Sequence, residues 1–145
     1  MAIDVTSSTV IDRPRAAVAS FLEDPSNDPR WIRALSTAER LTPPPYGPGT
    51  RVRRVAKMAG RTIDYTTEIT AHIPGERTEM DTVKGLQMHV TYALTDEGEE
   101  RTRVSIRNQG GSGFLFAIAG PLIGRMVKSR VDDDLRELKR ILESD

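Results

Sequence analysis

The sequence has 145 residues, no cysteine, and 21 basic against 21 acidic residues, so its formal net charge is zero. This composition excludes disulfides, thiolate metal sites and cysteine nucleophiles, and it supplies no overall positive charge for binding nucleic acid. A chain of this length predicts one domain, residues 1–145, with a full hydrophobic core. The N-terminus, MAIDVTSSTVID, is too polar for a signal peptide, so we expect a cytoplasmic protein.

The first part of the chain predicts a strand and two short helices. Residues 2–11 alternate and are rich in β-branched side chains, which is typical of a strand. An Asp-Arg-Pro tripeptide then marks the start of a helix over 14–24, whose apolar face carries Val18, Phe21 and Leu22. Pro25 ends this helix, and a second short helix at 28–32 carries Trp31, the only tryptophan.

The middle of the chain predicts a run of six more strands. The loop 42–49, TPPPYGPG, pairs poorly because of its four prolines, whereas the later connections are short and turn-like. Short turns between consecutive strands predict an antiparallel meander. The strands are expected at 34–41, 50–58, 61–73, 76–83, 86–95 and 100–108.

The most apolar stretch, GGSGFLFAIAGPLIGRMV, covers residues 110–127. Its apolar part, 114–124, is 11 residues long, whereas a membrane-spanning helix needs about 20, so we predict no stable membrane insertion. Pro121 suits the first turn of a helix, and GFLFAIA before it forms either a separate turn or an irregular lead-in. From there an amphipathic helix of more than 20 residues is expected, with apolar positions at Leu122, Met126, Val127, Val131, Leu135, Leu138 and Leu142. Strands followed by one long helix favour an α+β fold with the helix packed across one face of the sheet.

This order of elements resembles the START-related polyketide cyclase/dehydrase and lipid-transport superfamily (SRPBCC). The resemblance covers essentially the whole chain and is a pattern of spacing and residue class rather than a catalytic signature. The stretches that carry it are VIDRPRAAVASFLEDPSNDPRWI, LTPPPYGPGTRVR, GRTIDYTTEIT, TYALTDEGEERTRVSIR and LRELKRIL.

The resemblance implies a helix-grip fold, in which a seven-stranded antiparallel sheet curls around the long C-terminal helix. Sheet and helix enclose a cavity in which members hold lipids, sterols, polyketides, hormones or aromatic intermediates. Some members cyclise or dehydrate polyketides, others only carry ligands, and one subgroup is linked to toxin–antitoxin pairs. In this architecture 114–124 forms a wall and lip of the cavity, with a break at Gly120-Pro121; from the residues alone, core packing explains this stretch equally well.

Strand alternation assigns an inner face to the cavity. On 50–58 the inward face is ambiguous, because Val52, Ala56 and Met58 share a face with Arg54 and would bring it inward. Trp31 either closes one end as a plug or offers a stacking surface. The candidate ligand-binding residues are Trp31, Arg54, Tyr65, Met80, Met88, Val90, Tyr92, Val104, Asn108, Phe114, Phe116, Leu122 and Met126.

Other possible sites fail on spacing. The only histidines, His72 and His89, lack a metal-like spacing to carboxylates, and His89 is expected to point outward. The triplet 132–134 projects its carboxylates about 100° apart on a helix, as a solvated face. The mid-strand acids Asp64, Glu68, Glu79 and Asp81 are expected outward, so no acid–base residue is evident. We therefore predict no metal and no cofactor. We also predict no nucleic-acid partner, because the basic set at 51–61 lacks the interleaved aromatic side chains on which bases stack.

Three functions follow from this reading. The first is a small module that binds or transports a hydrophobic or aromatic molecule in the cavity, as a monomer or homodimer. The second is a polyketide cyclase or dehydratase, in which a tyrosine or Arg54 polarises a carbonyl. The third is a protein-interaction role of the toxin type. A clean cavity with no buried acid, base or paired polar groups favours the first. A tyrosine–arginine or tyrosine–asparagine pair converging inside favours the second, and an exposed apolar patch over a filled core favours the third.

Overall fold

The computed structural model describes residues 3–58, 60–111 and 114–144, and the side chains of 114–120 lie outside this description. The chain forms seven strands, two short helices and one long helix, with a 3-10 turn at Pro25–Asn27. The elements are β1 (Ile3–Ile11), α1 (Arg15–Leu22), α2 (Asp28–Trp31), β2 (Leu35–Arg40), β3 (Arg51–Met58), β4 (Arg61–Ile73), β5 (Arg77–Lys84), β6 (Met88–Asp96), β7 (Thr102–Gly110) and α3 (Phe114–Glu143).

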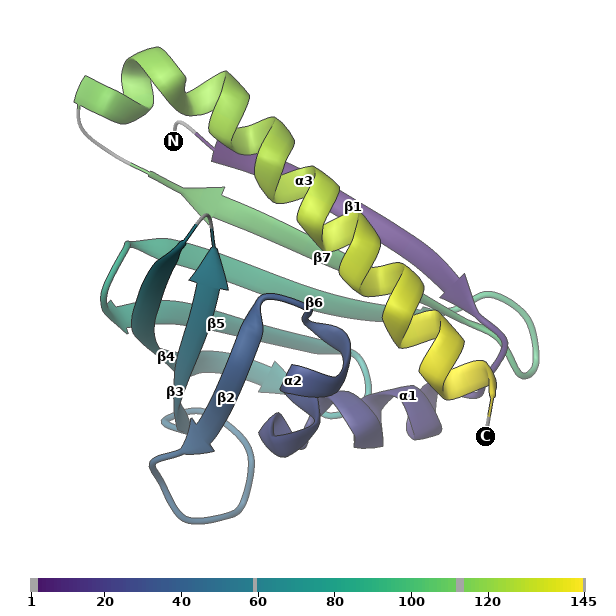
Figure 1. The fold of residues 1–145 in the computed structure, drawn as a ribbon. Coiled ribbons are helices and arrows are strands. Elements are labelled where there is room, and N and C mark those ends of the chain that lie inside the picture. The colour runs from purple at the N-terminus through teal and green to yellow at the C-terminus, as the bar shows by residue number, and fades with distance from the viewer. Residues whose placement is uncertain (1–2, 59, 112–113, 145) are drawn as a thin grey trace.

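The seven strands form one antiparallel sheet in the order β1-β7-β6-β5-β4-β3-β2. The predicted meander is confirmed, because every strand from β2 to β7 pairs with its sequence neighbour. β1 forms one edge of the sheet and pairs with β7, from Ile3 opposite Gly110 to Ile11 opposite Thr102. Figure 1 shows the sheet curled around α3, with α1 and α2 at one end, which is the helix-grip arrangement.

Helix α3 differs from its prediction at its start. It begins at Phe114 rather than at Pro121, so Pro121 lies inside the helix and not in its first turn. The expected break at Gly120-Pro121 is therefore wrong for the backbone, because the helix runs through both residues. The prediction missed this because a proline removes one helical hydrogen bond and usually marks a helix start. No described helix is long and apolar enough to cross a membrane.

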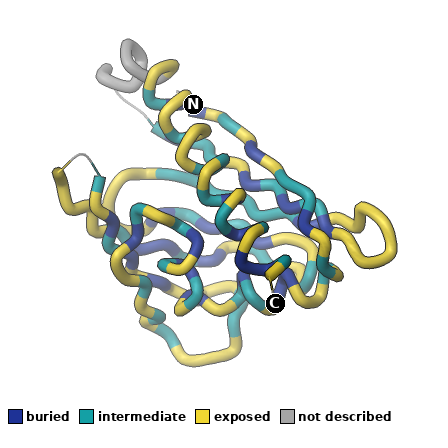
Figure 2. Tube along the Cα trace, turned by 45° about the vertical axis from the view of Figure 1, so that its right-hand side comes forward, coloured by how far each residue is buried: buried dark blue, intermediate teal, exposed yellow. Residues whose placement is uncertain are grey.

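Among the described side chains of α3, those that join the hydrophobic core lie in its second half. Leu135, Leu138 and Leu142 are buried there against β1, β6, β7 and the two short helices, and Figure 2 shows buried positions gathered at this end. The first half runs along β1, where Gly124 comes close to Val5, with 3.6 Å from its would-be Cβ to the valine methyl. Leu122, two residues earlier and on the opposite side of the helix, is 70% exposed.

A leucine-to-alanine substitution should affect stability very differently in the two halves of α3. Leu138→Ala should lower the free energy of unfolding by about 2–5 kcal/mol, because it opens a cavity among fully buried side chains. Leu122→Ala is the matched control in the same helix and should change it by less than about 0.5 kcal/mol. Urea unfolding measures both, and equal losses would contradict the division of α3.

Candidate functional site

The inward face of β3 brings an arginine into the sheet's interior. Val52, Arg54 and Ala56 are buried, whereas the intervening side chains of Arg51 and Arg53 are exposed. The ambiguity left by the sequence is resolved, since Arg54 shares the apolar face and keeps only 7% of its surface exposed. A guanidinium at such depth requires hydrogen bonds and a counter-charge, because an unpaired buried charge is strongly unfavourable.

Asp28 supplies that counter-charge from α2. Its Oδ2 accepts hydrogen bonds from Arg54 Nε at 3.1 Å and from Nη2 at 2.9 Å. Thr67 on β4 completes the set, since its Oγ1 accepts from Arg54 Nη1 at 2.6 Å. Both charged side chains are nearly inaccessible to solvent, at 8% exposure for the arginine and 4% for the aspartate. The pair therefore joins α2 to the sheet.

Sequence reasoning missed Asp28 as a site residue. The residue begins a helix of only four residues, and an acid at a helix start is usually explained by capping. The one available signal was the predicted inward position of Arg54, which required an acid somewhere on the elements that cover the same face. A short-range pattern could not identify which acid, because 26 residues separate the partners.

Burial and charge act against each other in this pair. Burial raises the pKa of Asp28, and the guanidinium of Arg54 opposes that shift. Burial lowers the pKa of Arg54, but the Asp28 carboxylate outweighs it, so the arginine stays cationic. The site thus holds a fixed positive group that its own anion neutralises.

Aromatic side chains from α2, β4, β6 and the loop before β3 surround the pair. Trp31 and Tyr92 meet edge to face, with ring centroids 6.2 Å apart. Burial raises the pKa of Tyr65 and of Tyr92, and it raises the pKa of Tyr46 to about 12. All three phenols therefore stay protonated at neutral pH and act as hydrogen-bond donors rather than bases. Tyr46, from the loop before β3, was not predicted as a site residue.

A small pocket lies between Tyr92, Tyr46 and Thr78. Its volume is about 20 Å³, enough for about one water molecule. Two of its lining residues contact His72, whose Nδ1 lies 2.9 Å from Thr78 Oγ1 and whose Nε2 lies 3.7 Å from Glu23 Oε1. The Nε1 of Trp31 is also buried and faces the Asp28 carboxylate, whose pKa its N–H helps to lower against the effect of burial. Polar atoms thus line an interior that is otherwise apolar.

The other predicted lining residues fall into distinct environments. Met80 and Val104 are buried in the sheet's interior, at 4% and 0% exposure. Met88, Val90 and Asn108 are half-buried on the inner face, together with Tyr65 and Tyr92. Leu122 and Met126 are exposed, at 70% and 45%, on the side of α3 away from β1. The side chains of Phe114 and Phe116 lie outside the described residues.

The inner face is unevenly covered. Near α1 and α2 the inner face is buried, as Leu94 is, and Trp31 of α2 covers it there. Toward the start of α3 the same face stays half-exposed at Met58 and Met88, and Ile63 is 37% exposed. Access to the Arg54 site is therefore expected from the end where α3 begins.

The outer face of the sheet carries paired charges. His89 points outward as predicted, where its Nδ1 lies 2.6 Å from Asp81 Oδ1 and its Nε2 3.0 Å from Glu79 Oε1. The carboxylates at 132–134 take separate partners, but Asp134 is half-buried and accepts the N–H of Arg33 at 3.1 Å, so the prediction of a fully solvated face is wrong there. Across the described parts of the chain, no group of three or more histidines and carboxylates could hold a metal ion.

Comparisons with known proteins agree with this architecture. Residues 2–143 match the family model described as polyketide cyclase/dehydrase and lipid transport. A START superfamily protein from Mycobacterium smegmatis superposes with a TM-score of 0.83 at 11% identity, covering 97% of each chain. The Zhui aromatase/cyclase from Streptomyces sp. R1128 gives 0.79 at 15%, covering 97% of this chain and 93% of its own. The protein TTHA0849 from Thermus thermophilus gives 0.79 at 16%, covering 97% of each chain. No curated protein matches the sequence.

The buried pair makes a sharp prediction for stability. Asp28→Asn leaves Arg54 buried without its anion and should lower the free energy of unfolding by about 3–5 kcal/mol. Asp64→Asn is the control, since it breaks an exposed pair with Arg53 and should have a far smaller effect because solvent screens that pair. The double variant Asp28→Leu with Arg54→Met should recover most of the loss. Urea unfolding tests all three, and a small effect of Asp28→Asn would contradict the pairing.

The histidine on the outer face predicts a pH dependence. The hydrogen bond to Asp81 raises the pKa of His89 above its usual 6.5, with burial opposing and Glu79 adding to the rise. The stabilisation by His89 is therefore fully present below pH 6.5 and is lost as pH rises through the higher folded value. The difference in unfolding free energy between the natural protein and His89→Gln should shrink over this window. A constant difference from about pH 6 to 9 would refute it.

Proposed function

The chain belongs to the polyketide cyclase/dehydrase and lipid-transport family, and we propose that it binds and carries a hydrophobic or aromatic small molecule on the inner face of its sheet. The observation that carries the proposal is a single buried arginine in an apolar interior, flanked by tyrosines. Ligand sites in proteins are mostly apolar and contain a few placed polar groups that fix orientation. Arg54, Tyr65 and Tyr92 have this character.

The state of the arginine defines the preferred ligand. Three of the five N–H groups of Arg54 donate to Asp28 and Thr67. The other two have no acceptor among the described residues and can donate to a ligand. Because Asp28 neutralises the charge, a ligand carboxylate would meet no net positive field and would lose its hydration. A ketone or phenol oxygen accepts the same hydrogen bonds at a lower desolvation cost. The preferred ligand is therefore neutral, with an apolar, ring-containing body and a carbonyl or hydroxyl at its inner end.

A cyclase or dehydratase is the second candidate. The convergence of Arg54 with Tyr65 and Tyr92 favours it, because protonated phenols beside a guanidinium can polarise a carbonyl and promote enolisation. A base is lacking among the residues that the structure describes, however. Asp28 accepts a hydrogen bond from the arginine at 2.9 Å, and every other described carboxylate or histidine beside the arginine already has a partner. Ring closure of a poly-β-ketone faster than in buffer would favour the enzyme, and an unchanged rate would favour the carrier.

Trp31 provides the readout for the binding test. Fluorenone, a neutral tricyclic ketone, should quench its fluorescence saturably, and fluorenone carboxylate should bind more weakly. Tyr65→Phe and Tyr92→Phe each remove one hydroxyl at nearly constant volume, so each should weaken fluorenone binding about twofold to tenfold. His89→Gln, on the opposite face of β6, is the control and should bind normally.

Two results would count against the proposal. One is the absence of saturable quenching together with no small molecule in an organic extract of the purified protein. The other is saturable binding that neither tyrosine variant weakens, because this would place the ligand away from Arg54.

A further inference from the structure

The end of the molecule where α3 begins exposes several large aliphatic side chains. The β3–β4 turn, the β5–β6 turn and the start of α3 are all at this end of the sheet, since β5 ends beside β4 and β7 leads into α3 (Figure 1). Exposed fractions range from 37% to 70%. We call these residues the apolar rim: Ile63, Val83, Leu86, Leu122 and Met126.

Cations without ion partners share the same end. Lys57, Arg61, Lys84 and Arg125 are exposed and make no ion pair with the described residues. Carboxylates nearby are already engaged, since Asp64 pairs with Arg53 and Asp4 pairs with Arg107. We call these four the basic rim, and it keeps its positive charge toward solvent.

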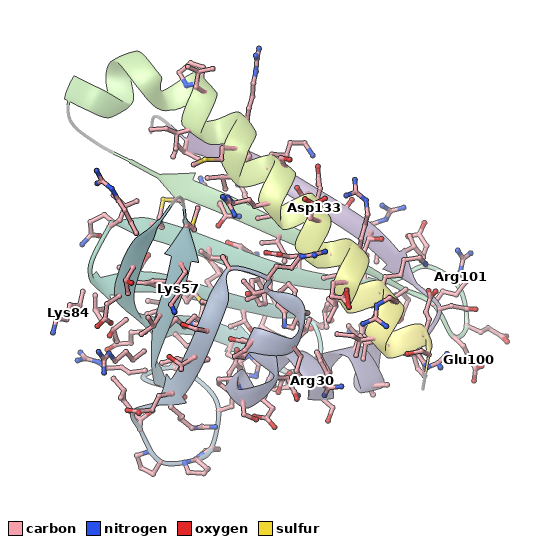
Figure 3. The ribbon with its side chains drawn as sticks, viewed as in Figure 1. Arg30, Lys57, Lys84, Glu100, Arg101 and Asp133 are labelled. Carbon is pink, nitrogen blue, oxygen red and sulfur yellow. The ribbon has the colours of Figure 1, made fainter. Side chains whose placement is uncertain are left out.

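The opposite end carries both signs of charge. The β6–β7 turn reads Asp-Glu-Gly-Glu-Glu over 96–100, but Asp96 pairs with Arg15 and Glu97 pairs with Arg103. Figure 3 places Glu100 beside Arg101, at the far end of the molecule from Lys84. Charge at that end is therefore largely cancelled locally, whereas the four cations of the basic rim have no ion partner among the described residues. Such a molecule meets a negative surface with its basic rim first.

We propose that this end docks on the surface of an anionic lipid bilayer. Aliphatic side chains ringed by lysine and arginine match a lipid interface, because the side chains enter the headgroup boundary while the cations meet negative headgroups. This combination distinguishes a bilayer from the two other occupants. A second copy in a two-fold contact would bring like charges together, and a nucleic acid would leave the aliphatic rim without a role, since single strands need aromatic stacking.

The docking surface also lies beside the uncovered part of the inner face. Ile63 belongs to both, because its side chain is on the inner face of β4 and is 37% exposed. A bilayer at this end would lie against the entrance expected for the Arg54 site. The docking itself does not depend on the identity or existence of a bound ligand.

Cosedimentation with vesicles tests the proposal. The purified protein should bind vesicles of phosphatidylcholine with phosphatidylglycerol, bind pure phosphatidylcholine far more weakly, and lose binding as salt rises. Arg61→Gln with Lys84→Gln should weaken partitioning about twentyfold or more, at about fivefold per cation. Leu86→Ser with Leu122→Ser should weaken it with no change in charge.

Matched controls separate docking from general charge or stickiness. Arg101→Gln with Arg136→Gln changes the net charge equally away from the basic rim, and Leu41→Ser with Ile73→Ser removes two exposed aliphatic side chains elsewhere, at 47% and 52% exposure. Both controls should bind like the natural protein. Thermal unfolding verifies that every variant is folded. The proposal is overturned if anionic vesicles bind no better than neutral ones, or if the controls lose as much binding as the rim variants.

Discussion

The ion pair between Arg54 and Asp28 is the constraint around which the interior is organised. A guanidinium on the inner face of the sheet is tolerable only with an anion and hydrogen bonds at the same depth. That requirement holds α2 against β3 and β4 and fixes Trp31, three residues after Asp28, over the same interior. Replacing such a pair with apolar residues is often neutral for stability.

Helix α3 divides the molecule into a sealed half and an open half. Its C-terminal half is locked by Leu135, Leu138 and Leu142, and the short helices complete the core there. Its N-terminal half passes beside β1 at Gly124, and the inner face of the sheet at that end stays half-exposed at Met58 and Met88. The buried polar group and the accessible end thus belong to one interior, which is the arrangement that a binding protein requires. The same openness exposes Leu122 and Met126, which a purely structural helix would bury.

Charge distribution is the second organising feature, and totals conceal it. The equal numbers of acidic and basic residues suggest a surface without preference. In space, exposed pairs such as Arg53–Asp64, Arg107–Asp4 and Arg103–Glu97 cancel locally, while the cations of the basic rim have no ion partner among the described residues. Composition excluded a strongly basic protein correctly, but it carried no information about this distribution.

The sequence by itself determined the fold class, the strand order of the meander, the inward faces of β4 to β7 and the amphipathic helix, but left the inward face of β3 open. Side-chain direction repeats every two residues in a strand and every 3.6 residues in a helix, so these features can be read from neighbouring side chains. Only the tertiary structure decided that Asp28 neutralises Arg54, that Tyr46 joins the site, that α3 begins at Phe114, and that Leu122 is exposed while Leu138 is buried. Each of these depends on which distant segments meet, and that is set by packing across the whole chain rather than by any local period.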